Sequence, residues 1–519
     1  MSSIGQTSML EHGRRKWWVL LITCVPLFMM MLDATIVNIA LPNIMYDFNT
    51  DISSIEWVLN AYVLTFAVLL ITLGKLGDLY GRKRLFLSGL GLFTLASLLC
   101  GLSPNEHVLI GARVLQAVGG AGMMPATLSI LNVAFGEKGK GMALGIWGAV
   151  AGVASALGPV IGGVLVDHYS WPWIFLINLP VGILAFIAAI FIIRESTDPT
   201  AERRIDIPGV LAVSTALFCL TFALVEGQKY GWTSTTILSL FSVSFVGFVV
   251  FIAIERWRSA PLIRLDLFRN RTFSAGNSVA LILMFGLLSI LFLLVMFLQL
   301  VLGFSAIKTG LVLLPMPIVT MIVAPISGRL SDRIGSRWLL FFGMLLIALG
   351  IYLMSDLTPD MGWKHLILPL AVCGLGMGMS MAPMTAAVMS SAPMERSGQA
   401  AGVLTTMRQV GAVLGISVIG AVLQNQLVTN VREALLPISS IPPLIQNKIL
   451  DELSSGRLVM GQSIPELPGP LGNQIVLLLK QEFAHSLNTA MMVSVFICVF
   501  GASVALLVRS HVSRRKTTG

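Results

Sequence analysis

Charged residues are scarce in this sequence of 519 residues: they make up 11% of the chain, against 56% for hydrophobic residues. A composition so poor in charge excludes an ordinary soluble domain and is typical of proteins that cross a membrane several times. The hydrophobic runs are near twenty residues long, which suits helices across a hydrocarbon core of roughly 30 Å better than the short alternating strands of a barrel. We therefore expect an all-α integral membrane protein.

Cysteine is also rare, with five residues, each in a separate apolar run. A free cysteine there behaves as a small hydrophobic residue, so the sequence predicts no disulfide framework and no metal site. No P-loop, dinucleotide fingerprint or nucleophile elbow stands at a position that water would reach. These absences argue against an enzyme, a bound cofactor and an ATP-driven pump, and they leave an ion gradient as the energy source.

Fourteen hydrophobic runs are bounded by glycine, proline and charge clusters, and they predict fourteen transmembrane helices. The first run is too long for a signal peptide and lacks a small-residue cleavage site, so we expect it to stay in the protein. The predicted spans are 17–41, 54–74, 85–103, 107–134, 141–166, 173–193, 207–225, 236–254, 273–301, 309–328, 338–355, 365–389, 399–424 and 485–508.

The basic residues orient these spans. With the N-terminus inside, 25 of the 34 lysines and arginines fall in cytoplasmic loops, as the positive-inside rule requires. The even number of spans then places both termini in the cytoplasm. The net charge of +9 marks these loops and not a nucleic-acid partner. The external segments contain no glycosylation sequon, which suits a bacterial plasma membrane.

Two segments resemble each other: "GKLGDLYGRKR" at 74–84 and "GRLSDRIGSR" at 328–337. They indicate an internal duplication in parallel topology. Because they lie eight predicted spans apart, we expect two six-helix bundles, residues 1–194 and 273–519, separated by two inserted helices within 195–272.

One long external connection is predicted at 425–484. The stretches 444–453 and 474–483 have the apolar spacing of short amphipathic helices. A surface insertion and a gate or partner site are both compatible with this pattern.

An acid stands inside the first predicted span, where "MLDATIVNIALP" carries Asp33. A charge at mid-membrane costs about 2.5 to 3.5 kcal/mol on insertion scales, so it needs a cavity or a partner. Counted from the outer helix ends, Asp33 lies about 12 Å deep and Arg113 about 9 Å. We hypothesise that Asp33 exchanges a proton for substrate and that Arg113 tunes it. The alternative is a static ion pair that locks two helices.

The first repeat places Asp78 and Arg82 one turn apart, with Gly74 and Gly81 beside them. The acid could bind a helix N-terminus or pair across the halves, forming a conformational latch on the cytoplasmic side. A solvated loop that merely obeys the charge bias is the alternative. In the second repeat, Asp332 and Arg333 form a weaker copy.

Small residues and methionines suggest two further roles. Glycines and a proline in the fifth span predict a hinge at a close helix interface; they are Gly158, Pro159, Gly162 and Gly163. Flexible apolar side chains could line a promiscuous substrate pocket; the candidates are Met30, Phe285, Met316 and Met381. Arg408 could bond backbone carbonyls or an anionic group of the substrate, because the neighbouring spans of its half contain no acid.

Four motifs together carry a family resemblance. "GKLGDLYGRKR", "LDATIVNIALP", "RVLQAVGGA" and "GPVIGG" resemble the signatures of the fourteen-helix drug:proton antiporters of the major facilitator superfamily, in the same order and on matching spans. The resemblance implies a proton-coupled antiporter that exports amphipathic, often cationic, drugs from two bundles by alternating access. An exporter of a lipid or endogenous metabolite and a non-transporting membrane sensor are the alternatives. The expected partners are small organic substrates, protons and membrane lipids; the oligomeric state stays open, with a monomer compatible.

Overall fold

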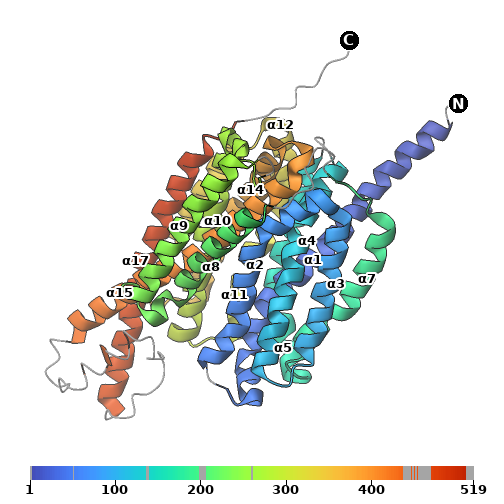
Figure 1. The fold of residues 1–519 in the computed structure, drawn as a ribbon. Coiled ribbons are helices and arrows are strands. Elements are labelled where there is room, and N and C mark those ends of the chain that lie inside the picture. Colours follow the sequence, from blue (N-terminus) through green and yellow to red (C-terminus); the bar gives the residue numbers. More distant parts are fainter. Residues whose placement is uncertain are drawn as a thin grey trace.

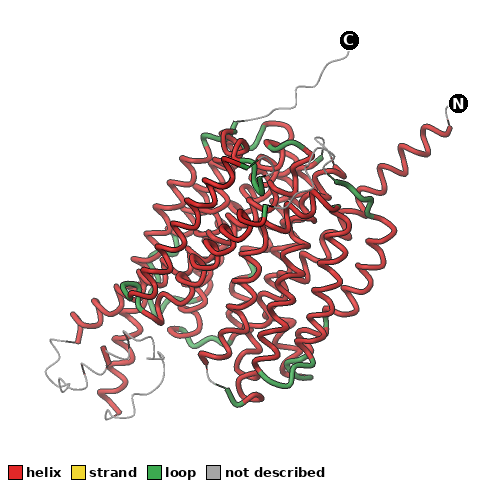
Figure 2. Tube along the Cα trace, in the orientation of Figure 1, coloured by secondary structure: helices red, strands yellow, loops and turns green. Residues whose placement is uncertain are grey.

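Helices form all the regular structure in the part of the chain that the computed structural model describes, and no strand occurs there (Figure 2). The described residues are 3–50, 52–135, 139–197, 206–258, 261–435 and 469–509, with 446, 449, 450 and 453 between the last two ranges. Each predicted span overlaps a helix of the structure. The all-α prediction is therefore confirmed.

The helices follow one another through short connections. The first part of the chain forms α1 (Ser3–Phe48), α2 (Ile52–Tyr80), α3 (Arg82–Gly101), α4 (Glu106–Phe135), α5 (Lys140–His168), α6 (Trp173–Leu176) and α7 (Asn178–Ile192). The middle forms α8 (Ile207–Tyr230) and α9 (Thr235–Trp257). The last part forms η1 (Leu265–Arg269), α10 (Arg271–Met296), η2 (Phe297–Val301), α11 (Ala306–Leu313), α12 (Pro315–Ile334), α13 (Arg337–Tyr352), η3 (Trp363–Leu366), α14 (Ile367–Ser391), η4 (Met394–Arg396), α15 (Ser397–Leu435) and α17 (Gly469–Ala505).

Two predicted spans are each divided into two helices. The span 173–193 breaks at Ile177 between α6 and α7, and the span 309–328 breaks at Leu314 between α11 and α12. Proline explains both breaks, because it donates no backbone hydrogen bond and leaves the carbonyl four residues earlier without its helical partner. Pro180 and Pro315 stand three residues and one residue after these breaks.

The predicted connection 425–484 is too long at both ends. Helix α15 continues to Leu435 and α17 begins at Gly469. The physical reason is a buried stripe at helical spacing on each helix: Leu423, Leu427, Val431 and Leu435 on α15, and Ile475, Leu479, Phe483 and Leu487 on α17. The two helices pack together, and Asn430 Nδ2 of α15 donates to Ser486 Oγ of α17 at 2.9 Å. The segment 444–453 lies mostly outside the described residues.

The chain forms two groups of helices with the middle pair beside them (Figure 1). Most of helices α1–α7 pack with one another, as do most of α10–α17, while α5 packs on α12 and α2 on α15 across the two groups. Helix α8 contacts both groups: the rings of Phe222 and Trp57 on α2 lie 5.8 Å apart, and Ser417 Oγ on α15 donates to the carbonyl of Leu224 at 2.7 Å. Helix α8 of the inserted pair therefore bridges the two groups.

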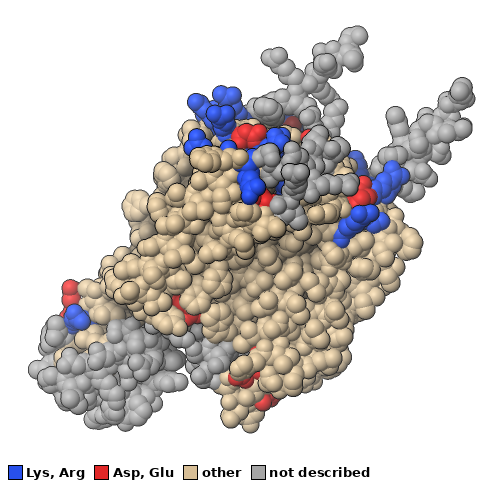
Figure 3. Space-filling view, viewed as in Figure 1, with Lys and Arg blue, Asp and Glu red and all other residues tan. Residues whose placement is uncertain are grey.

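The start of α1 and the end of α17 lie at the same end of the molecule (Figure 1). Lysine and arginine gather on that end in the face shown in Figure 3. Among the described residues, twelve helices are long and apolar enough to cross a membrane, and shorter apolar stretches lie in α5 and α13, at Lys140–Ala154 and Arg337–Tyr352. The fold is that of a multi-pass membrane protein, and the count of fourteen spans stays a prediction.

Candidate functional site

A buried ion pair joins α1 to α4. Arg113 Nη1 lies 2.5 Å from Asp33 Oδ2, and both residues are only 1% exposed. Arg113 Nε also donates to the carbonyl of Val58 on α2, at 3.1 Å. An isolated charge would be strongly disfavoured in this apolar core, so each charge is held there by the other. Three helices of the first group meet at this pair.

Three polar side chains complete the surroundings of the pair. Gln116 Oε1 accepts from Arg113 Nη1 at 2.6 Å, while Gln116 Nε2 donates to Asp33 Oδ1 at 3.0 Å and to Ser97 Oγ at 2.9 Å. The ring of Tyr62 lies 4.2 Å from Arg113 Cζ, a favourable position for a cation. These three residues are absent from the sequence predictions. Gln116 follows Arg113 by one helical turn, a usable signal, whereas Ser97 and Tyr62 come from other helices.

Glycines of α5 hold α1 close to this pair. A Cβ at Gly162 would lie 2.7 Å from Ile36 Cγ1, and Gly158 packs against the same turn of α1. Gly163 points elsewhere, toward α11 of the other group, where a Cβ would lie 3.3 Å from an isoleucine side chain. The side chain of Pro159 lies outside the described residues. The predicted hinge region thus packs against both groups, and its hinge role stays a prediction.

Asp78 binds the N-terminus of α15 across the two groups of helices. Its Oδ1 accepts from the backbone N–H of Gly398 and its Oδ2 from that of Gln399, each at 2.9 Å. Arg82 Nη2 lies 2.8 Å from Asp78 Oδ1 and also donates to two carbonyls of η4. A carboxylate at a helix N-terminus satisfies free N–H groups and interacts favourably with the helix dipole. We call these four residues the α2–α15 junction.

Two glycines permit this geometry. A Cβ at Gly74 would lie 2.6 Å from the carbonyl oxygen of Gly398, so α2 and α15 cross at backbone contact. Gly81 has φ +118°, a conformation that disfavours any side chain. A Cβ there would also collide with the carboxylate of Glu195, which accepts backbone N–H groups at the start of α3.

The second repeat makes a similar contact between α12 and α5. Asp332 Oδ1 accepts from the N–H of Gly141 at 3.2 Å, and Gly328 crosses the backbone of Gly141. We call these three residues the α5–α12 junction. Asp332 thus takes part in a contact between the groups, whereas Arg333 is exposed and has no side-chain partner within the described ranges, and its latch role stays a prediction. The residue that corresponds to Arg82 in this repeat is Ser336.

The comparisons with known proteins agree with this architecture. The family model for the Major Facilitator Superfamily matches residues 23–416.

The chain belongs to the Major Facilitator Superfamily.

Curated relatives cover most of this facilitator chain. "Multidrug resistance protein Stp" of Mycobacterium tuberculosis is 35% identical over 85% of the chain and 82% of that protein. "Tetracenomycin C resistance and export protein" of Streptomyces glaucescens is 34% identical, covering 98% and 94%. "Multidrug transporter protein MdtP" of Bacillus subtilis is 33% identical, covering 96% and 95%. The predicted family is confirmed, and the chain is a multi-pass bacterial plasma-membrane protein and a transporter rather than an enzyme.

A solved structure shares the facilitator fold. A bacterial homologue of the human lysosomal transporter Spinster, described as inward-facing and unoccupied, has a TM-score of 0.53 and 18% identity, covering 95% of this chain and 97% of its own. At this identity the likeness supports the fold alone.

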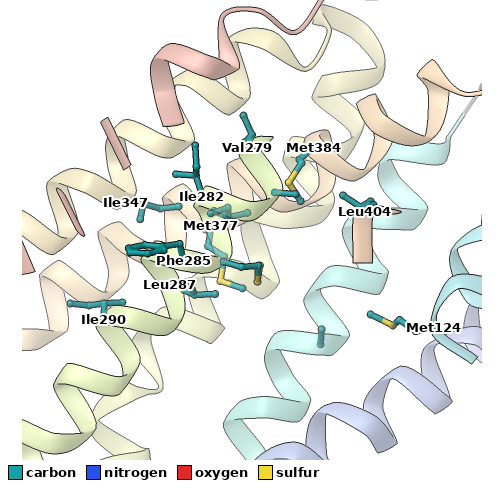
Figure 4. Packing of buried hydrophobic residues seen from close by; sticks show 14 of the residues in the cluster. Met124, Val279, Ile282, Phe285, Leu287, Ile290, Ile347, Met377, Met384 and Leu404 are labelled. Atoms are coloured by element: carbon teal, nitrogen blue, oxygen red, sulfur yellow. The ribbon is translucent and has the colours of Figure 1, made fainter. Parts of the chain in front are cut away.

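The apolar substrate candidates of this facilitator belong to both groups of helices. Met30 of α1 lies beside Gly120 of α4, where a Cβ would be 3.3 Å from its methyl carbon. Phe285 of α10 is buried with Met377, Ile282 and Ile347 in the core of the second group (Figure 4). Met30 therefore lies in the first group of helices and Phe285 in the second.

The remaining two candidates lie on α12 and α14. Met316 is buried on α12, with its backbone packed on Gly374 of α14. Met381 of α14 faces α5, since its sulfur would lie 3.8 Å from a Cβ at Gly148. A substrate role for these side chains stays a prediction.

Proposed function

We propose that this facilitator is a proton-coupled antiporter that exports amphipathic, often cationic, organic compounds by alternating access. The names of the relatives support drug export, because they describe multidrug resistance, multidrug transport, and resistance with export. Proton coupling rests on the residues of the site.

The buried pair of Asp33 and Arg113 is the observation that carries the proposal. Both carboxylate oxygens are engaged, one by Arg113 and one by Gln116. Protonation of Asp33 would remove the charge that holds Arg113, so proton binding would change the packing of α1 on α4. The glycines of α5 lie against the next turn of α1. Through this contact, a shift of α1 would displace α5, which also packs against the second group.

The two junctions would close one side of the transporter. We propose that this side is cytoplasmic, since the basic residues and both described chain ends gather there (Figure 3). Both junctions join the proposed bundles, 1–194 and 273–519, so opening that side requires both to separate. The full α5 helix has 29 residues, about 44 Å at 1.5 Å per residue. That length supports its inclusion among fourteen spans.

Substrate-induced proton release from purified protein tests the proposal. We expect ethidium, a lipophilic cation, to release protons from the wild type and not from Asp33→Asn. Asp47→Asn is the matched control, because Asp47 is a carboxylate near the outer end of the same helix, where it accepts from Trp171 Nε1 at 2.8 Å. Proton release that persists in a folded Asp33→Asn protein would refute this role.

A further inference from the structure

The second group of helices contains a buried charge that has no countercharge among the described residues. Arg408 of α15 is 6% exposed. Its Nη2 donates to Thr385 Oγ1 on α14, and its Nε is buried without any hydrogen-bond partner among the described residues. A guanidinium has five N–H donors. The structure therefore holds an arginine whose hydrogen-bonding capacity is largely unused.

Asn277 of α10 lies at the same level as Arg408. Gly411 and Gly415 of α15 pack against the backbone of Leu281 and Phe285 of α10. The contact advances by four residues on both helices, from Gly411 and Leu281 to Gly415 and Phe285. One turn earlier, the turn of α15 that includes Arg408 therefore lies beside the turn of α10 that includes Asn277. The amide of Asn277 is 2% exposed, its Nδ2 donates to the carbonyl of Phe273, and its Oδ1 has no partner among the described residues.

Thr385 belongs to this level as well. Gly276 of α10 packs against Val388 of α14, one turn from Thr385. Three packed helices thus bring polar side chains to one level of an otherwise apolar core. The apolar residues Val279, Met384 and Leu404 lie on the same three helices, within one turn of the polar residues (Figure 4). An unused donor and an unused acceptor at one level are costly unless a further polar group joins them.

This level faces the first group of helices. Thr385 follows Met381 by one turn, and Met381 faces Gly148 of α5. Arg408 lies eleven residues beyond the start of α15, about 16 Å into the helix. The polar level is therefore deep in the molecule and on the side of α14 from which cargo between the groups would approach.

The buried acids Asp33 and Asp78 of the first group already bind other partners and do not pair with Arg408. Asp33 is fully engaged by Arg113 and Gln116. Asp78 serves the N-terminus of α15, about 15 Å from Arg408 along the helix. In the second group, the described parts of α10, α11, α14 and α15 through their membrane stretches contain no acidic residue. A cargo that reaches mid-membrane would meet a neutralised ion pair on one side and, on the other, a guanidinium that lacks an acidic partner among the described residues.

We propose that Arg408, held by Thr385, forms a subsite that binds a carboxylate or phenolate oxygen of the transported compound, while the unused Oδ1 of Asn277 accepts from an N–H or O–H group of the same compound. The cargo class then includes amphipathic molecules that carry an acidic group, zwitterions among them. Arg408 supplies a charge-assisted hydrogen bond, and Thr385 holds the guanidinium in place. This proposal rests on the export function proposed above and assigns one chemical group of its substrates.

A matched pair of dyes tests the subsite: a rhodamine with a free benzoate and its methyl ester, which differ only in that group. Binding of each dye to purified protein is followed by fluorescence anisotropy. We expect the wild type to bind the acid about tenfold more tightly than the ester, the difference expected for one hydrogen bond to a charged group. Arg408→Gln should abolish this preference while the ester binds as before.

Two further variants separate a binding role from a packing role. Arg408→Lys keeps the charge but loses the fork of donors, so part of the preference should remain. Arg432→Gln alters an exposed arginine on the same helix and should change neither affinity. Equal ratios in wild type and Arg408→Gln, or a wild type without preference, would overturn the subsite. Ethidium-induced proton release measures the antiport proposal separately, because ethidium carries no acidic group.

Discussion

In the α2–α15 junction, Asp78 is completely buried and accepts two backbone N–H groups of the opposite helix. In the α5–α12 junction, Asp332 is half-buried and receives the N–H of Gly141 at a longer distance. Both junctions add a crossing of two glycines. The duplication has therefore preserved the carboxylate at a helix N-terminus and the close backbone approach.

The two junctions differ in their arginine. Arg82 bonds Asp78 and also reaches the carbonyls of η4, which precede α15. In the α5–α12 junction, the residue equivalent to Arg82 is Ser336. A completely buried carboxylate that bonds an arginine directly contributes more than a half-exposed one, which faces the N–H groups of Gly141 and Met142 and the charge of Lys140. We infer that the first junction supplies most of the stability of the closed side.

Asp78→Asn should produce the largest change. The amide loses the charge that two N–H groups of α15 and Arg82 all bind. The expected cost to the closed state is about 3 kcal/mol, a shift of roughly 150-fold in the ratio of closed to open molecules. Distances between spin labels at exposed positions 84 and 338, on α3 and α13, would report it. An unchanged distance distribution in a folded variant would contradict the inferred dominance of this junction.

Gly74→Ala should have an intermediate effect. The added Cβ would meet the carbonyl oxygen of Gly398, a backbone atom that cannot rotate away. Overpacking of this kind costs about 1 to 3 kcal/mol. The same spin-label pair measures it. Gly111→Ala on α4 is the matched control, because nothing lies within 4 Å of a Cβ there; a similar response of the two variants would show that helix flexibility and not the crossing is responsible.

The sequence predicts the partners of these junctions only in part. The repeat identifies Asp78, Asp332 and the glycines, and charge bias places them at one end of the spans. It does not identify Gly398 or Gly141, since a helix N-terminus binds an acid through backbone N–H groups that every residue possesses. The sequence also does not show that Arg333 is exposed while Asp332 reaches α5, although neighbours in sequence on a helix do point in different directions.

The buried charges show the same limit. Depth counting brings Asp33 and Arg113 to one level because both helices are long and cross the same layer. It does not reveal Gln116 as the group that engages the second oxygen of Asp33. For Arg408, the missing acid in its half is visible in the sequence. The approach of Asn277 and Thr385 is not, because it depends on glycine contacts between helices far apart in the chain.

Asp332→Asn should have the smallest effect and sharpens the comparison most directly. A half-exposed carboxylate at a helix N-terminus contributes about 0.3 to 1 kcal/mol, so the ratio of closed to open molecules should fall about two- to fivefold. Arg333→Gln, at the adjacent exposed position without a side-chain partner in the described ranges, is the control and should leave the ratio unchanged. If Asp332→Asn opened the protein as far as Asp78→Asn does, the arginine would not account for the difference between the junctions, and the shared helix-terminus contact would carry the closure in both.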